Sequence, residues 1–173
     1  MANQMIIRDR EIVADDWITV GDDEPIPNGD VIVSWERWLA DGEAILARPG
    51  RIGVRINGEH DARDLTRDLQ QFALVVIEFP TYADGRGYSH ARILRDQLGF
   101  SGELRASGNV LRDQIFYLAR VGFNAFESDG GKSLESVLEG LNDFSVTYQA
   151  AADEPRPLYR RKDPAFANAS AKH

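Results

Sequence analysis

The 173-residue chain contains no cysteine, and this absence excludes several kinds of chemistry. Without thiols the chain forms no disulfide, carries no thiolate nucleophile and holds no zinc or iron–sulfur cluster through sulfur. Histidine is scarce as well, because His60, His90 and His173 lie far apart and form no HxxxH or HxH pair. We therefore expect no histidine-based metal site, which leaves carboxylates as the ligands for a cation such as Mg²⁺.

Positive charge is in short supply. Lysine and arginine number 20 against 28 aspartates and glutamates, a formal net charge of -8. The electric field of this net negative charge repels a polyanion, so we expect no nucleic-acid partner and only a local anion site.

The chain also lacks the run of about 18 apolar residues that a membrane span needs, and its first residues show no apolar signal segment. We expect a cytoplasmic protein without a membrane partner.

Short β-branched runs alternate along the chain with segments that have apolar residues at helical spacing. Residues 5–20 hold two short apolar groups around a polar centre, which predicts a β-hairpin or an arm laid on the domain. Further strands are expected at 31–33, 51–56, 74–79, 103–107, 124–127 and, on a weaker pattern, 146–149. The first helical segment follows residue 34, with Trp35, Trp38, Leu39 and Leu46 expected on its buried side.

This alternation requires parallel strands joined by right-handed crossovers. We predict one α/β domain over residues 1–150, a TIM-like partial barrel of parallel βα repeats with an N-terminal β-hairpin. The alternative is an open, flavodoxin-like three-layer sheet.

Residues 151–173 are rich in alanine, proline and charge, which predicts an extended or mobile tail. A partial barrel has open edges, which the hairpin or a second subunit of a homodimer would cover.

Four predicted strands carry an ionisable residue near their C-terminal end: Arg55, Glu78, Arg105 and Glu127. The signs alternate in chain order. If the strands lie side by side in that order, opposite charges face each other along one interior row and partly neutralise each other. Such a row fits a structural ion-pair network as well as a catalytic site.

The loops after these strands place glycine and small polar residues just before helices, where backbone N–H groups suit an anion. Capping of the helices explains the same residues. The candidate anion-binding residues are Arg86, Arg105, Ser107, Gly108, Asn109 and Arg112.

The neighbouring helix carries Arg92 and Arg95, which we expect on its solvated face, with Asp96 as the i,i+4 partner of Arg92. For acid–base catalysis the candidates are Glu78 and Asp84, although no Ser/His/Asp or Cys/His arrangement accompanies them. No GxGxxG or complete GxxxxGK[ST] loop is present, so we predict no cofactor. The residues alone leave open whether the protein is an enzyme.

Residues 79–126 read FPTYADGRGYSHARILRDQLGFSGELRASGNVLRDQIFYLARVGFNAF. This segment resembles domain-of-unknown-function family 934, a bacterial family with DGRGYS, then an Ala-Arg-x-Leu-Arg helix, then GELRA-x-G and a DQ-containing helix. The departure is small: Ile93 stands where leucine is commoner. The resemblance implies a pathway, because members are often encoded beside assimilatory nitrite/sulfite reductase and are sometimes labelled probable oxidoreductases of sulfite reduction. It brings no established catalytic residues.

Three functions remain open from the sequence. The favoured one, implied by the resemblance, is an accessory or binding protein of assimilatory sulfite reduction whose partner is the sulfite reductase and whose ligand is a small anion. The second is a small cytoplasmic enzyme with a partial-barrel site for an anionic substrate, with Glu78 or Asp84 as base. The third is an oxidoreductase that borrows a cofactor, which the missing fingerprints disfavour.

Overall fold

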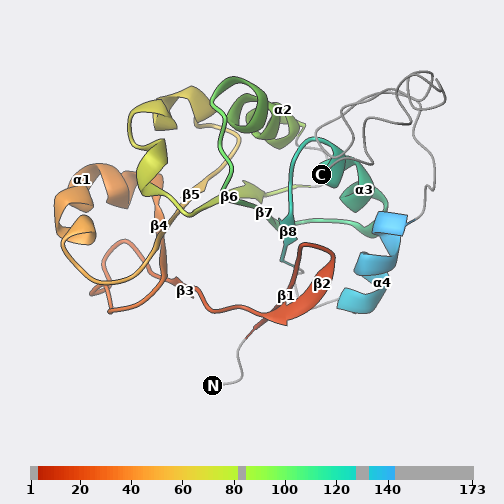
Figure 1. Cartoon of the computed structure of the whole chain (residues 1–173), viewed down its shortest axis with the longest axis horizontal. Helices are drawn as coiled ribbons and strands as arrows, with labels where there is room; N and C mark the ends of the chain where they lie inside the picture. Colours follow the sequence, from red (N-terminus) through yellow and green to blue (C-terminus); the bar gives the residue numbers. More distant parts are fainter. Residues whose placement is uncertain (1–3, 82–84, 128–132, 143–173) are drawn as a thin grey trace, which may run out of the picture.

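The structure is a computed structural model, and it describes residues 4–81, 85–127 and 133–142. In these residues one sheet of eight strands has the order β2-β1-β8-β7-β6-β5-β4-β3 (Figure 1). The strands are β1 (Met5–Arg8), β2 (Glu11–Ala14), β3 (Ile18–Thr19), β4 (Val31–Ser34), β5 (Ile52–Ile56), β6 (Leu74–Phe79), β7 (Glu103–Gly108) and β8 (Ala125–Phe126). Strands β3 to β8 run parallel to one another. Strand β1 pairs antiparallel with both β2 and β8.

Strands β4 to β8 confirm five of the predicted strands, and they lie side by side in chain order. This order confirms the partial-barrel prediction, because the flavodoxin-like alternative requires the order to reverse within the sheet. The predicted strand at 146–149 and the predicted tail at 151–173 lie outside the described residues. The domain limits stay predictions.

The N-terminal segment joins the two edges of the sheet. Strands β1 and β2 form the predicted hairpin, whose turn residues Asp9 and Arg10 both have positive φ, at 49° and 68°. A turn with two positive φ angles matches the twist of the paired strands. Strand β2 ends one edge of the sheet and β3 ends the other, and residues 15–17, which we call the strap, are all that separates them in sequence.

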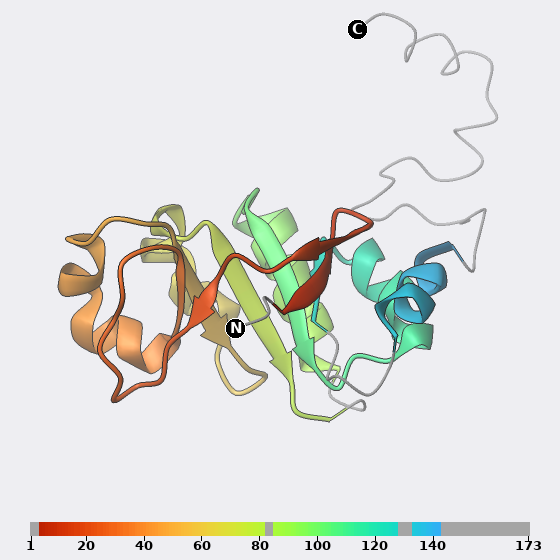
Figure 2. The ribbon, with the colours of Figure 1, turned by 90° about the horizontal axis from the view of Figure 1, so that it is seen from below.

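The strap limits how far apart the two edges can lie. Four Cα–Cα steps of 3.8 Å span at most about 15 Å between Ala14 and Ile18. The sheet therefore curls toward itself as a half-barrel, and the strap passes along its open side (Figures 1 and 2). The hairpin and strap together take the covering role expected of the N-terminal segment.

Helices and turns cover the outer face of the curled sheet (Figure 1). They are α1 (Trp35–Leu46), η1 (Ala62–Arg67), η2 (Leu69–Gln71), α2 (Arg86–Arg92), η3 (Ile93–Gln97), α3 (Arg112–Arg120), α4 (Leu134–Glu139) and η4 (Gly140–Asn142). Because side chains alternate along a strand, Val54, Ile77 and Leu104 point outward into the main core. Their neighbours point inward, where a separate small cluster joins Leu74 and Val76 to the strap.

Two helical predictions are wrong in detail. Leu39 and Leu46 are 65% and 46% exposed, and Ile45 is buried in their place. Helix α1 contacts β4 and β5 at one end of the covering layer, so its buried stripe is narrow and these two leucines lie beside it.

Arg95 is the second correction. The structure turns its guanidinium inward, where it donates to the carbonyl oxygens of Phe100, Gly102 and Gly122 at 2.6, 2.8 and 2.9 Å. Arg92 keeps the predicted exposed pair with Asp96, at 2.7 Å. The difference arises because the loop after η3 and the turn after α3 both place carbonyl groups beside Arg95, and the tertiary fold brings these two segments together.

Candidate functional site

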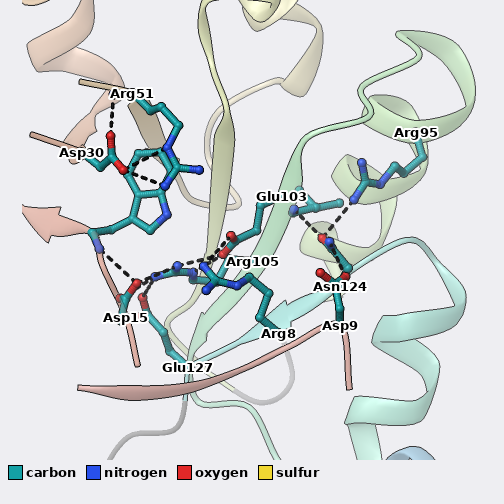
Figure 3. A network of polar contacts seen from close by, with 12 residues as sticks. Arg8, Asp9, Asp15, Asp30, Arg51, Arg95, Glu103, Arg105, Asn124 and Glu127 are labelled. Atoms are coloured by element: carbon teal, nitrogen blue, oxygen red, sulfur yellow. Dashed lines mark hydrogen bonds and ion pairs between the residues drawn. The ribbon is translucent and has the colours of Figure 1, made fainter. Parts of the chain in front are cut away.

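Arg105 lies at the centre of the inner face of the sheet and has no solvent-exposed surface. Its Nε–H donates to Glu103, while Nη1 donates to Asp15 and Glu127 and Nη2 to Asp15 and Glu103, at 2.8 to 3.0 Å (Figure 3). A guanidinium has five N–H donors, so every one is used.

The three carboxylates come from different parts of the chain. Asp15 belongs to the strap, Glu103 precedes Arg105 by two residues on the same face of β7, and Glu127 directly follows β8. Burial alone lowers the pKa of Arg105, but hydrogen bonds and the negative charges of Asp15 and Glu103 outweigh it and raise the pKa above its ordinary value. The permanently charged Arg105 thereby fastens the strap to the sheet through a bidentate pair with Asp15.

The strap is held a second time at Trp17. Its ring packs with Ile32, Leu74 and Val76 in the inner cluster, and the guanidinium of Arg51 lies over it, 4.9 Å from the ring centroid. Arg51 is itself fixed by Asp30, whose Oδ2 accepts from Nε and Nη2 at 2.9 and 2.6 Å (Figure 3). These hydrogen bonds hold the pKa of Asp30 below its ordinary value. The orientation of the indole is thus set by packing and charge.

Beside the strap lies a cavity of about 310 Å³. Its lining combines the strap and its flanks with the inner face of the sheet: Gln4, Asp15, Trp17, Ile18, Thr19, Arg55 and Glu127. A volume of this size is at the lower end of the range for small-molecule sites.

Two N–H donors of the lining are buried and find no acceptor in the part of the chain that the structure describes. They are the Nε of Arg55 and the indole Nε1 of Trp17. Arg55 has one contact from Nη2 to the Thr19 hydroxyl, at 3.5 Å. The Arg55 Nε and the Trp17 Nε1 are both covered by surrounding protein atoms, so Arg55 offers a ligand its terminal guanidinium nitrogens and not its Nε.

The predicted charge row is brought onto one face of the sheet, but its pairing differs from the simple alternation. Strand register places Arg55 and Arg105 on either side of Val76, with Glu78 two residues further along β6. Arg105 pairs with Glu127, and Arg55 and Glu127 line the same cavity. Glu78 makes no ion pair with another described residue.

The candidate anion-binding residues do not gather at this cavity. Ser107 is 3% exposed, and the backbone N–H of Asn109 donates to the Phe79 carbonyl at 2.9 Å. Gly108 has a φ of +84°, which favours glycine at that turn. Anion binding by these loop residues stays a prediction.

Two of the cations in the same prediction, Arg86 and Arg112, do not line this cavity. Arg86 begins α2, and Arg112 reaches Glu139 at 3.9 Å. Arg105 has no donor left for an anion, so we assign it to the ion-pair network. Asp84 lies outside the described residues.

Sequence reasoning missed Asp15, Trp17 and Glu103 as members of the site. Asp15 and Trp17 lie in the stretch ADDW, which resembles an ordinary polar connector, and Glu103 looks like a strand-edge carboxylate. The only sequence signal that could have identified members of the site here is the position of two aspartates between apolar groups. The contact to Arg105 spans 90 residues of sequence, so it comes from the tertiary fold.

Within the described residues no group of three or more histidine, aspartate and glutamate side chains has a geometry that could hold a metal ion. The same residues include no helix with the length and apolarity needed to cross a membrane.

These features define an α/β protein with a curled sheet, a strap locked by a buried ion-pair network and a small polar cavity beside the strap. The chain belongs to DUF934, a family described as a bacterial protein of unknown function, whose profile matches residues 53–159. The resemblance of residues 79–126 is thereby confirmed. Searches of curated proteins and of solved structures found no match.

Proposed function

We propose that this protein is an accessory binding protein of assimilatory sulfite reduction, which acts with the sulfite reductase and holds the anionic group of a small ligand in the cavity. The observation that carries the binding role is the Arg55 guanidinium in the cavity lining, which makes no ion pair with a described residue and contacts the Thr19 hydroxyl at 3.5 Å. The link to sulfite reduction rests on the family resemblance, and the reductase partner is part of the proposal.

The lining favours binding over catalysis. Asp15 accepts from Arg105 with both carboxylate oxygens, and Glu127 accepts with one. Carboxylates that hold a buried arginine are poorly placed to exchange protons with a substrate, since protonation would break the pair. We assign electron transfer to the centres of the reductase.

The partner role is tested by copurification. The tagged full-length chain is expressed in a bacterium that contains the reductase, and the bound fraction is probed for reductase in physiological and in high salt. We expect the reductase to be retained in both. Its absence at physiological salt, under conditions where the tagged chain is folded and recovered, would overturn the accessory role.

A second candidate function is a small enzyme in which Glu78 acts as general base. The observation in its favour is that Glu78 is half-buried on the inner face without an ion pair to a described residue. Its test is Glu78→Gln, a near-isosteric change: growth on sulfate as the sole sulfur source should fail if Glu78 is the base. Unchanged growth would remove this candidate.

A further inference from the structure

The cavity lining carries both signs of charge. The Arg55 guanidinium and the Thr19 hydroxyl supply hydrogen-bond donors. Glu127 lines the same cavity, gives only its Oε1 to Arg105 and is 15% exposed. The lining thus combines a cation with a carboxylate that retains an oxygen for a further donor.

Among the described residues of the ion-pair network and the cavity lining, positive and negative charges are equal in number. The arginines Arg8, Arg55 and Arg105 balance the three carboxylates of the network, Asp15, Glu103 and Glu127. A simple anion would leave this partly buried group with net negative charge, and a simple cation would leave it positive. A ligand that carries both charges keeps the balance, and charges of low exposure are costly when they are left unbalanced.

The wall of the cavity at Trp17 is rigid. Trp17 is 7% exposed, packed on the inner cluster and stacked against Arg51, so its indole cannot turn without disturbing that packing. Arg55 extends from β5, between β4 and β6. A wall that packing holds in place before the ligand arrives loses little conformational entropy on binding.

We propose that the ligand of this cavity is a small zwitterion of amino-acid size, with its carboxylate or sulfonate on Arg55 and Thr19 and its ammonium group on Glu127. This inference rests on the proposed binding role of the same cavity and names the class of its ligand. The volume of about 310 Å³ accommodates such a molecule, whereas an inorganic oxyanion alone would fill only part of it.

Isothermal titration of the full chain tests the proposal with defined probes: sulfite and acetate as anions, ethylamine as a cation, and taurine and the 20 natural L-amino acids. We expect at least one zwitterion to bind about 10-fold or more tightly than any single-charge probe, since one additional charged hydrogen bond is worth about 1.5–3 kcal/mol. Glu127→Gln should reduce zwitterion affinity to that of the anions and leave sulfite binding unchanged.

The controls separate this inference from the proposed function. Arg55→Met should abolish binding of both classes, and Arg92→Ala, at an exposed ion pair outside the lining, should change neither. If sulfite binds as tightly as any zwitterion, the zwitterion proposal is overturned while the anion-binding role stands. If no probe binds the wild-type chain, both fail. The wild-type comparison decides the matter even if Glu127→Gln does not fold.

Discussion

Replacement of Arg105 by methionine is the perturbation whose effect the structure defines best. Methionine has a similar length but supplies none of the five hydrogen bonds, so three carboxylates are left facing one another at 9%, 12% and 15% exposure. Arg8 lies 3.5 Å from Glu103 and Arg55 lines the same cavity as Asp15 and Glu127, but neither arginine replaces the five lost hydrogen bonds. Removing one member of a buried ion pair costs about 3–5 kcal/mol, and we expect about 4 kcal/mol here.

The assay is urea unfolding of the wild-type chain and Arg105→Met, with thermal unfolding as a second measurement. A loss of about 4 kcal/mol corresponds to a fall in Tm of about 12 °C for a domain of this size. A variant within about 1 kcal/mol of the wild type at neutral pH would refute the buried-network account.

Three further predictions follow from other contacts. Arg95→Met should lower the free energy of unfolding by about 2–3 kcal/mol, because buried carbonyl groups lose their donor. Arg92→Ala, at an exposed ion pair, should change it by less than about 0.5 kcal/mol. Urea unfolding of both variants and the wild type measures the difference. Gly87→Ala should cost about 1–3 kcal/mol by thermal unfolding, because its Cβ would meet a phenylalanine ring of β6, and a silent change would contradict that packing. The hydrogen bonds from Arg51 lower the pKa of Asp30. The difference in unfolding free energy between wild type and Asp30→Asn should therefore be constant at neutral pH and close as the pH falls below about 4. A difference that widens in acid would contradict the lowered pKa.

The repeating part of the fold was predictable because its strands are local and apolar. LVVIEF, now β6, is the clearest case: an uninterrupted apolar run predicts a strand covered on both faces, and its outward residues enter the core. The order of these strands in the sheet could be predicted from their order in the sequence, since parallel strands joined by short crossovers tend to lie next to their sequence neighbours.

The site was predictable only in part. Arg55, Arg105 and Glu127 could be placed on one face because side chains alternate along strands whose positions were known. Asp15 could not be recognised as a partner of Arg105, since it reaches Arg105 through a closure of the sheet that no local pattern encodes. Arg95 was misplaced because its helical spacing matches that of a surface residue, whereas its acceptors are carbonyl groups of the following loop and, from the turn after α3, of Gly122.

The most direct test of the central claim, that the strap cavity is the functional site of a protein of sulfite reduction, is growth on sulfate as the sole sulfur source. A bacterium lacking its own copy of the gene receives the wild-type chain, Arg55→Met or the exposed control Arg92→Ala, each verified as folded and equally abundant. We predict that the wild-type chain and Arg92→Ala restore growth and that Arg55→Met does not. Wild-type growth with Arg55→Met would contradict the claim.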